Sequence, residues 1–328
     1  MRARLALAFV LLAAPALAEP VAGPSASIEV ARLQGAIFAG LSQDGDAVLV
    51  TNLADGRLYR RGPDGAFVAF GPVFPHGTDA FGDPDGPYRV ERVGGRFIVA
   101  QGWTPVEAIE GPLDHALVEV GADGNAKALD ADFWNPFSFV ANGETLYIVD
   151  AAKNAIERRA ADGTRTTLAT FPRLVQRGAA MQTLSPTEFS AQKPYEVDAV
   201  PTGIAHRDGR LYVSLFGGFP YIAGRGAVVS IEPTGGGQRT EGEKFDMPVG
   251  VAFDGLGRIM VLEHGTFDQA KGFVPGSGRL VRIDPRSRVR ETLIGGLTRP
   301  AAVLALDATH FVVSELGGTL IYLIVPPN

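Results

Sequence analysis

The chain has 328 residues, a formal net charge of −6 and no cysteine. The lack of cysteine excludes disulfides, thiolate metal sites, covalent haem attachment and a cysteine nucleophile. Acidic and basic residues are interspersed with no block of lysine or arginine, which argues against a nucleic acid partner, because such binding depends on neutralising phosphates.

The first residues predict export. Two arginines precede an apolar run over residues 5–12, and the sequence ALA at 16–18 is a small-x-small cleavage site. We therefore expect a secretory signal peptide over 1–18 and a periplasmic or secreted mature chain over 19–328. The alternative, an uncleaved membrane anchor, is disfavoured because the apolar run is shorter than the roughly 20 residues that cross a bilayer. No later segment is apolar enough to span, so no membrane span is expected after cleavage.

Six short apolar runs, rich in β-branched and aromatic residues, recur along the mature chain. Their starts are 49, 49, 65, 48 and 52 residues apart. Such a period with several strands per unit is typical of β-propeller blades, because a small sheet buries its faces only by stacking on neighbours. The runs are VLVTN from Val48, FIVAQ from Phe97, LYIVD from Leu146, LYVSL from Leu211, IMVLE from Ile259 and FVVSE from Phe311.

Each run lies in the same local pattern. A strand precedes it across a tight turn, such as NGET at 142–145 or RDGR at 207–210, and Asn-Gly and Asp-Gly favour hairpins because glycine accepts a positive φ. A third strand and a more polar fourth strand follow, as in RTTLATF at 165–171. The pattern predicts an all-β, six-bladed β-propeller with four-stranded antiparallel blades, forming one domain over 19–328. The alternatives are an open array or two sandwich domains.

The two ends of the mature chain complement each other. The last unit stops after its third strand, at LIVPPN, whereas the mature chain opens with an unassigned strand, SIEVARL, from Ser27 to Leu33. We expect this N-terminal strand to complete the last blade and close the ring, which removes exposed sheet edges.

The connections between strands fall on two faces of such a ring, and all the long ones share one face. Long loops on a rigid face commonly carry binding and catalysis, so we expect a small molecule or a protein partner to bind there. The alternative is that these loops only plug and rim the ring. The long segments are 71–87, 102–115, 172–199, 216–226 and 264–278.

The last residue of each run is expected near the mouth of the central channel, on the same face. The carboxylates among these residues are candidate ligands for a divalent cation such as Ca²⁺, which prefers oxygen atoms. The alternative is that each side chain binds a nearby backbone amide and stabilises its own blade. The residues are Asn52, Gln101, Asp150, Leu215, Glu263 and Glu315, and the metal candidates are Asp150, Glu263 and Glu315.

Other loop residues are candidates for a ligand site. His264 follows Glu263 directly and is a candidate general base, although one such neighbour is unsurprising among five histidines. Loop aromatics are candidates for stacking on a ligand, or for holding their own loops in place. They are Trp103, Phe216, Phe219, Tyr221, Phe267 and Phe273. The chain has no G-x-S-x-G elbow and no P-loop, so serine hydrolases and kinases are not indicated.

Three stretches carry a resemblance to known propellers. VPTGIAHRDGRLYVSLFGGFPYIAGRGAVVSIEP from Val200 and IMVLEHGTFDQAKGFVPGSGRLVRIDP from Ile259 are similar to the ScyD/ScyE family of exported bacterial propellers. NPFSFVANGETLYIVDAAKNAIERR from Asn135 is similar to that family and to NHL-type repeats. The resemblance spans most of the mature chain and implies a six-bladed fold. It implies no established catalytic residues.

Two other functions stay open. A metal-dependent lactone or ester hydrolase of the gluconolactonase and regucalcin type shares the fold. The positions that this second resemblance assigns to metal ligands are Phe137, Thr202, Val249 and Ala301 here, so a hydrolase would have to use Asp150, Glu263 or Glu315. A protein-interacting NHL-like scaffold of the cell envelope is the other alternative. We expect a monomer that binds rather than catalyses, and the sequence leaves enzymatic activity undecided. A deep pocket at the channel mouth favours a small ligand, and a broad flat apolar patch favours a partner.

Overall fold

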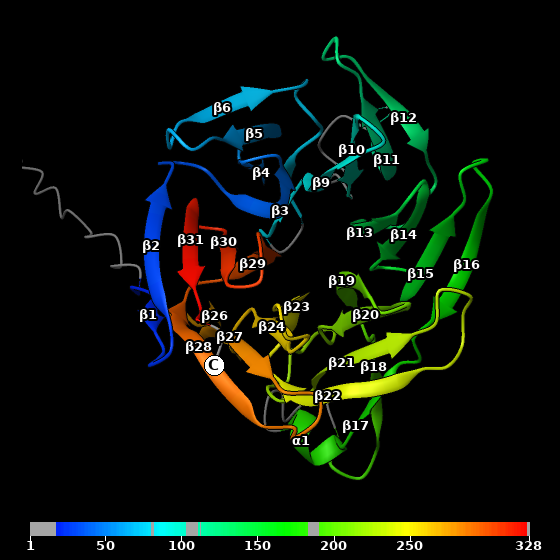
Figure 1. Ribbon diagram of the computed structural model, residues 1–328. Helices are drawn as coiled ribbons and strands as arrows, with labels where there is room; N and C mark the ends of the chain where they lie inside the picture. The colour runs from blue at the N-terminus through cyan, green and yellow to red at the C-terminus, as the bar shows by residue number, and fades with distance from the viewer. Residues whose placement is uncertain (1–17, 80–81, 103–110, 112, 183–189, 327–328) are drawn as a thin grey trace, which may run out of the picture.

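The computed structural model describes residues 18–79, 82–102, 111, 113–182 and 190–326, and it forms a closed ring of six blades (Figure 1). Each blade is a four-stranded antiparallel sheet whose first strand lies at the centre of the ring. The prediction of an all-β, six-bladed propeller is confirmed. The described residues contain a single short helix, α1 (Gly178–Gln182), and no helix among them is long and apolar enough to span a bilayer.

The blades follow one another in chain order. Blade 1 holds β3 (Phe38–Asp44), β4 (Ala47–Asn52), β5 (Arg57–Arg61) and β6 (Phe67–Phe70), and blade 2 holds β9 (Pro87–Val93), β10 (Arg96–Gln101), β11 (Ala116–Val120) and β12 (Ala126–Asp130). Blade 3 holds β13 (Pro136–Asn142), β14 (Thr145–Asp150), β15 (Ala155–Arg159) and β16 (Arg165–Thr170), and blade 4 holds β19 (Pro201–Arg207), β20 (Arg210–Leu215), β21 (Gly226–Ile231) and β22 (Arg239–Phe245). Blade 5 holds β23 (Pro248–Phe253), β24 (Ile259–Glu263), β27 (Gly278–Ile283) and β28 (Arg290–Leu297). Blade 6 holds β29 (Pro300–Ala305), β30 (His310–Glu315), β31 (Thr319–Ile324) and, from the start of the chain, β2 (Ser27–Arg32).

Local sequence explains how each blade begins. Five of the six central strands start with proline, which is tolerated there because the first residue of an edge strand need not donate to the ladder. The hairpin that follows is tight. In blade 4, Asp208 and Gly209 have φ values of 48° and 70°, the pair of positive angles that a two-residue type I′ turn requires.

Apolar side chains from neighbouring blades form a separate buried cluster at each of the six blade junctions. Between blades 2 and 3, for example, Ile98 and Leu117 pack with Phe139, and all three are fully buried. A blade therefore needs a neighbour on both sides to bury its apolar faces.

The N-terminal strand closes the ring as predicted. β2 pairs antiparallel with β31, with Ile28 opposite Leu323 and Val30 opposite Ile321. The sequence did not reveal a second attachment, in which β1 (Val21–Ala22) pairs with β28 and adds a fifth strand to blade 5. The start of the chain therefore binds two adjacent blades.

The described parts of the long-loop segments contain three short two-stranded sheets. They are the pairs β7 (Gly77–Thr78) with β8 (Pro84–Asp85), β17 (Leu174–Gln176) with β18 (Tyr195–Val197), and β25 (Phe267–Asp268) with β26 (Gly272–Phe273).

Truncation tests the closure. A chain that starts at Gly35 lacks β2, exposes the edge of β31 and loses the burial of Ile28 and Val30, so we expect aggregation or a loss of unfolding free energy on the order of 5 kcal/mol. A chain that starts at Pro24 lacks only β1 and is the matched control, with a small decrease in melting temperature. Size-exclusion chromatography and thermal melting measure both, and a monomeric Gly35 product with an unchanged melting temperature would contradict the closure.

Candidate functional site

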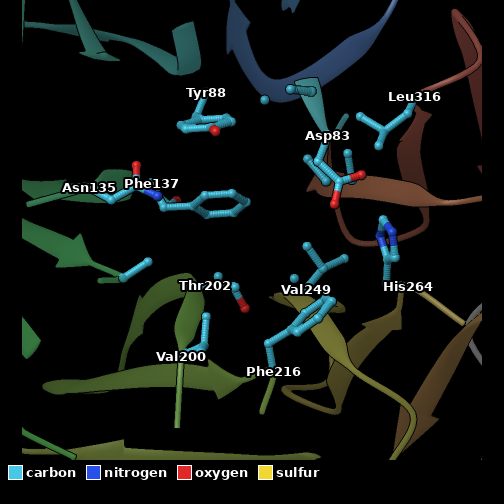
Figure 2. A pocket seen from close by; sticks show the side chains of 18 of the residues that line it. Asp83, Tyr88, Asn135, Phe137, Val200, Thr202, Phe216, Val249, His264 and Leu316 are labelled. Atoms are coloured by element: carbon cyan, nitrogen blue, oxygen red, sulfur yellow. The ribbon is translucent and has the colours of Figure 1, made fainter. Parts of the chain in front are cut away.

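The described residues enclose a cavity of about 430 Å³ where the central strands meet the long-loop face. The second residue of each central strand contributes to its floor, and Figure 2 shows several of these side chains pointing into the open space. The floor residues are Ala39, Tyr88, Phe137, Thr202, Val249 and Ala301. We call this cavity the mouth pocket.

One side of the mouth pocket is aromatic. The ring of Phe216 packs against those of Tyr221 and Phe273 with centroid distances of 5.9 and 6.4 Å, and Tyr221 lies 5.6 Å from Phe273. Phe216 and Tyr221 come from the β20–β21 loop, and Phe273 comes from the β24–β27 loop. We call these three residues the aromatic wall. Two loops that are distant in sequence therefore share one apolar surface.

The predicted loop aromatics have different positions. Phe216, Phe219 and Tyr221 all line the mouth pocket, and Phe219 is 61% exposed at its rim. Phe267 packs behind the aromatic wall, with its ring centroid 5.0 Å from that of Phe273. Trp103 lies outside the described residues. The sequence-based selection of these loops is therefore consistent with one shared surface.

His264 is buried in the pocket lining, beside the aromatic wall. Its Nδ1 lies 2.8 Å from the Pro300 carbonyl oxygen, and its Nε2 lies 3.4 Å from Nε of Arg299. Burial, reinforced by the positive charge of Arg299, lowers the pKa of His264 from 6.5 to about 3. The imidazole is therefore neutral at physiological pH, and both of its nitrogens face protein groups.

Charged groups adjoin the aromatic wall of the mouth pocket. Arg299 forms a 2.5 Å ion pair with Asp83 and lies over the ring of Phe273, 5.0 Å from its centroid. This contact ties the start of blade 6 to the loop that connects blades 1 and 2. It also holds the guanidinium between the acidic loop and the aromatic wall, and Figure 2 shows Asp83 and His264 on the same side of the pocket.

Asp85 is the most deeply buried carboxylate of the pocket lining, with 6% of its surface exposed. One oxygen accepts a hydrogen bond from the Tyr88 hydroxyl. Burial raises the pKa of Asp85 from 3.8 to about 6, and the negative charges of Asp79, Asp83 and Asp114 add to the rise. Burial, with the Asp85 charge beside it, also raises the pKa of Tyr88 well above its usual value.

The strand-end residues contact the backbone of their own blades. Asp150 accepts hydrogen bonds from the amides of Trp134 and Asn135 at 2.9 and 2.8 Å, immediately before β13. Glu263 accepts from Asp246 at 2.7 Å and Glu315 accepts from Thr298 at 2.6 Å, in the matching positions before β23 and β29. We call this repeated contact the blade clasp.

The other three strand-end residues vary the pattern. Asn52 accepts from the amide of Ile37 at 2.7 Å, as in the blade clasp. Gln101 instead donates to the carbonyl oxygen of Pro75 at 2.9 Å, and Leu215 has an apolar side chain. Among the described residues, no three acidic or histidine side chains are grouped so that they could hold a metal ion. The Ca²⁺ site stays a prediction.

Several pocket residues were not identified from the sequence. Tyr88, Asp85 and Arg299 all lie within two residues of the proline that opens a central strand. This proline occupies the same position in five blades, so the residues next to it in sequence lie at the channel mouth in each of these blades. The X-Pro steps at 86–87, 135–136, 200–201, 247–248 and 299–300 were the signal that could have found them.

Comparison with known proteins establishes the fold and no family. No protein-family model and no curated protein matches the sequence. Solved six-bladed propellers are similar in structure. A structural genomics protein of unknown function from Bacteroides thetaiotaomicron has a TM-score of 0.60 at 13% identity, with 92% of this chain and 76% of that chain covered. A gluconolactonase from Xanthomonas campestris has a TM-score of 0.59 at 13% identity, covering 92% and 91% of the two chains. A catalytically inactive virginiamycin B lyase from Staphylococcus aureus with quinupristin has a TM-score of 0.56 at 11% identity, covering 92% and 100%.

Substitution of a clasp residue separates a structural role from metal binding. Asp150→Asn places an amide group against two backbone donors, so we expect a loss of about 1–3 kcal/mol in unfolding free energy. Thermal melting in EDTA and in Ca²⁺ measures it, with Asp46→Asn on the exposed surface as the control. A loss that is equal in both conditions indicates a purely structural clasp, and a loss seen only with Ca²⁺ would contradict it.

The raised pKa of Asp85 predicts that ionisation of this carboxyl lowers the free energy of unfolding at high pH. The folded state holds the proton more tightly than the unfolded state, so the contribution of Asp85 to stability is complete below about pH 4 and is lost as the pH rises through about 6. Asp85→Asn removes the buried ionisable group. We therefore expect this variant to gain about 1–3 kcal/mol in unfolding free energy above pH 7 and to gain nothing at pH 4. Denaturant unfolding at both pH values measures it, and the opposite pH dependence would contradict the assignment.

Proposed function

We propose that this chain is an exported propeller of the ScyD/ScyE type that binds a small amphipathic molecule in its mouth pocket. The observation that carries the proposal is the pocket itself. A concave site of about 430 Å³, with a largely apolar lining and a few polar groups that converge on it, is the usual form of a small-molecule site.

The lining supports an amphipathic ligand because it combines an aromatic surface with charged groups. The aromatic wall offers ring faces and edges on which an apolar or aromatic body can pack. The charged groups of the lining offer carboxylates and guanidiniums, which orient polar groups through charge-assisted hydrogen bonds. A molecule with one apolar end and one polar end can contact the wall and these charged groups together.

The scaffold supports binding without large rearrangement. The floor comes from central strands that are fixed by their blades, and the wall comes from loops that pack on one another. A largely preformed site loses little conformational freedom when a ligand enters, which favours affinity.

A pocket-filling substitution tests the proposal. Ala301→Phe places a ring on the pocket floor, and Ala69→Phe, on the exposed outer strand of blade 1, makes the same change far from it. We expect amphipathic aromatic fragments to bind the mature protein and the Ala69→Phe control, and to lose at least about tenfold in affinity for Ala301→Phe.

Saturation-transfer NMR followed by calorimetry measures these affinities. Equal binding to both variants would place the ligand elsewhere on the protein. No binding of any fragment would contradict small-molecule recognition and favour a protein partner on the long-loop face.

A further inference from the structure

We propose that the ligand carries a cationic amine, and that the free carboxylate oxygen of Asp85 is its anchor. This inference rests on the proposed function and adds the chemical class of the ligand. It starts from a buried oxygen of a pocket carboxylate that has no hydrogen-bond partner among the described residues.

Asp85 has one satisfied and one unsatisfied oxygen. The Tyr88 hydroxyl donates to Oδ1, whereas Oδ2 is buried and has no hydrogen-bond partner among the residues that the structure describes. Leaving a buried carboxylate oxygen unpaired is costly, so native proteins rarely do so without a reason. Asp85 lines the mouth pocket, and because Oδ2 itself is buried, a small rotation of the side chain toward the pocket would let a bound donor complete its hydrogen bonding.

A residue at the equivalent position of another blade shows the contrast. Asp246 also stands two residues before the proline of its central strand. Its carboxylate accepts the Gly224 amide at 2.7 Å and lies 3.5 Å from the Arg279 guanidinium. An aspartate at this position of a blade can therefore have partners for both carboxylate oxygens. In blade 2, Asp85 lacks a partner for one of them.

The charges around Asp85 favour a cation over a neutral donor. Four carboxylates line the mouth pocket against two guanidiniums, and Arg299 is already paired with Asp83. The groups that act on Asp85 are the hydroxyl of Tyr88 and the negative charges of Asp79, Asp83 and Asp114. A bound ammonium relieves this repulsion, whereas a carboxylate ligand increases it.

The aromatic wall determines the rest of the ligand. It lies in the same pocket as Asp85, so an amine joined to an aromatic body by a short linker would contact both the wall and the carboxylate. Cations are also attracted to ring faces, which adds to the preference for a positive charge in this pocket.

A matched set of probes tests the charge. Naphthylethylamine, naphthylethanol and naphthylacetate share one body and differ in a cationic, neutral or anionic end. Near pH 8 we expect the amine to bind at least about tenfold more tightly than the alcohol, as for a hydrogen bond to a charged group, and the acid to bind most weakly. Calorimetry measures all three.

Substitution of Asp85 assigns the effect to one residue. Asp85→Asn should lower the amine affinity by about tenfold or more and leave the alcohol affinity within about twofold, whereas Asp46→Asn removes the same charge at the surface and should change neither. In the unmodified protein the amine affinity should rise about tenfold between about pH 5 and pH 8 as Asp85 ionises, and this rise should be absent in Asp85→Asn.

The outcomes separate this inference from the proposed function. Tightest binding by the acid, or equal binding by amine and alcohol with no effect of Asp85→Asn, would overturn the amine assignment and leave pocket binding intact. If no naphthyl probe binds, the fragments that do bind must favour amines over carboxylates, and the reverse preference would overturn the assignment. Failure of every fragment and probe would overturn both proposals.

Discussion

Burial between neighbouring blades is the interaction on which the rest of the structure depends. Each sheet has apolar side chains on both faces, and each blade junction holds its own buried cluster, so no blade is complete without two neighbours. A ring satisfies this requirement for every blade only if it closes. Pairing of β2 with β31 supplies the closure, and β1 extends the same segment onto blade 5. The central strands of the closed ring then position the six side chains that form the floor of the mouth pocket.

The blade clasp connects this scaffold to the site. By accepting amides that directly precede a central strand, Asp150, Glu263 and Glu315 set where that strand begins and which residue next faces the channel. In blade 4, another group replaces the clasp residue. In blade 4, where Leu215 cannot accept a hydrogen bond, Asn154 of blade 3 accepts the amide of Val200 at 2.8 Å. The hydrogen bonds of the blade clasp therefore stabilise each blade and also help to fix the shape of the mouth pocket.

Periodic signals in the sequence predicted the fold well and the site in part. The run from Val48 to Asn52 differs from β4 by one residue, and the closing strand begins at Ser27 in both cases. β1 and the small hairpins of the long loops escaped prediction, because a two-residue pair carries no periodicity. The sequence located Phe216, Tyr221 and His264 on the long-loop face, where they line the mouth pocket, but strand position alone does not reveal whether a carboxylate faces a backbone amide or a cavity.

Asp85 shows how a repeat scaffold can accommodate a side chain that lowers the stability of the fold. Its buried, incompletely bonded carboxylate opposes folding above pH 6, yet it is one residue in a ring whose six junctions are apolar and well packed. Binding sites commonly retain such local instability because the missing interaction is the one that the ligand supplies. A closed propeller suits this arrangement, since stability is distributed over all blade junctions while Asp85 lies at the channel mouth. The loops there can vary in chemistry because the closure at β2 and β31 lies in the outer strands of blade 6.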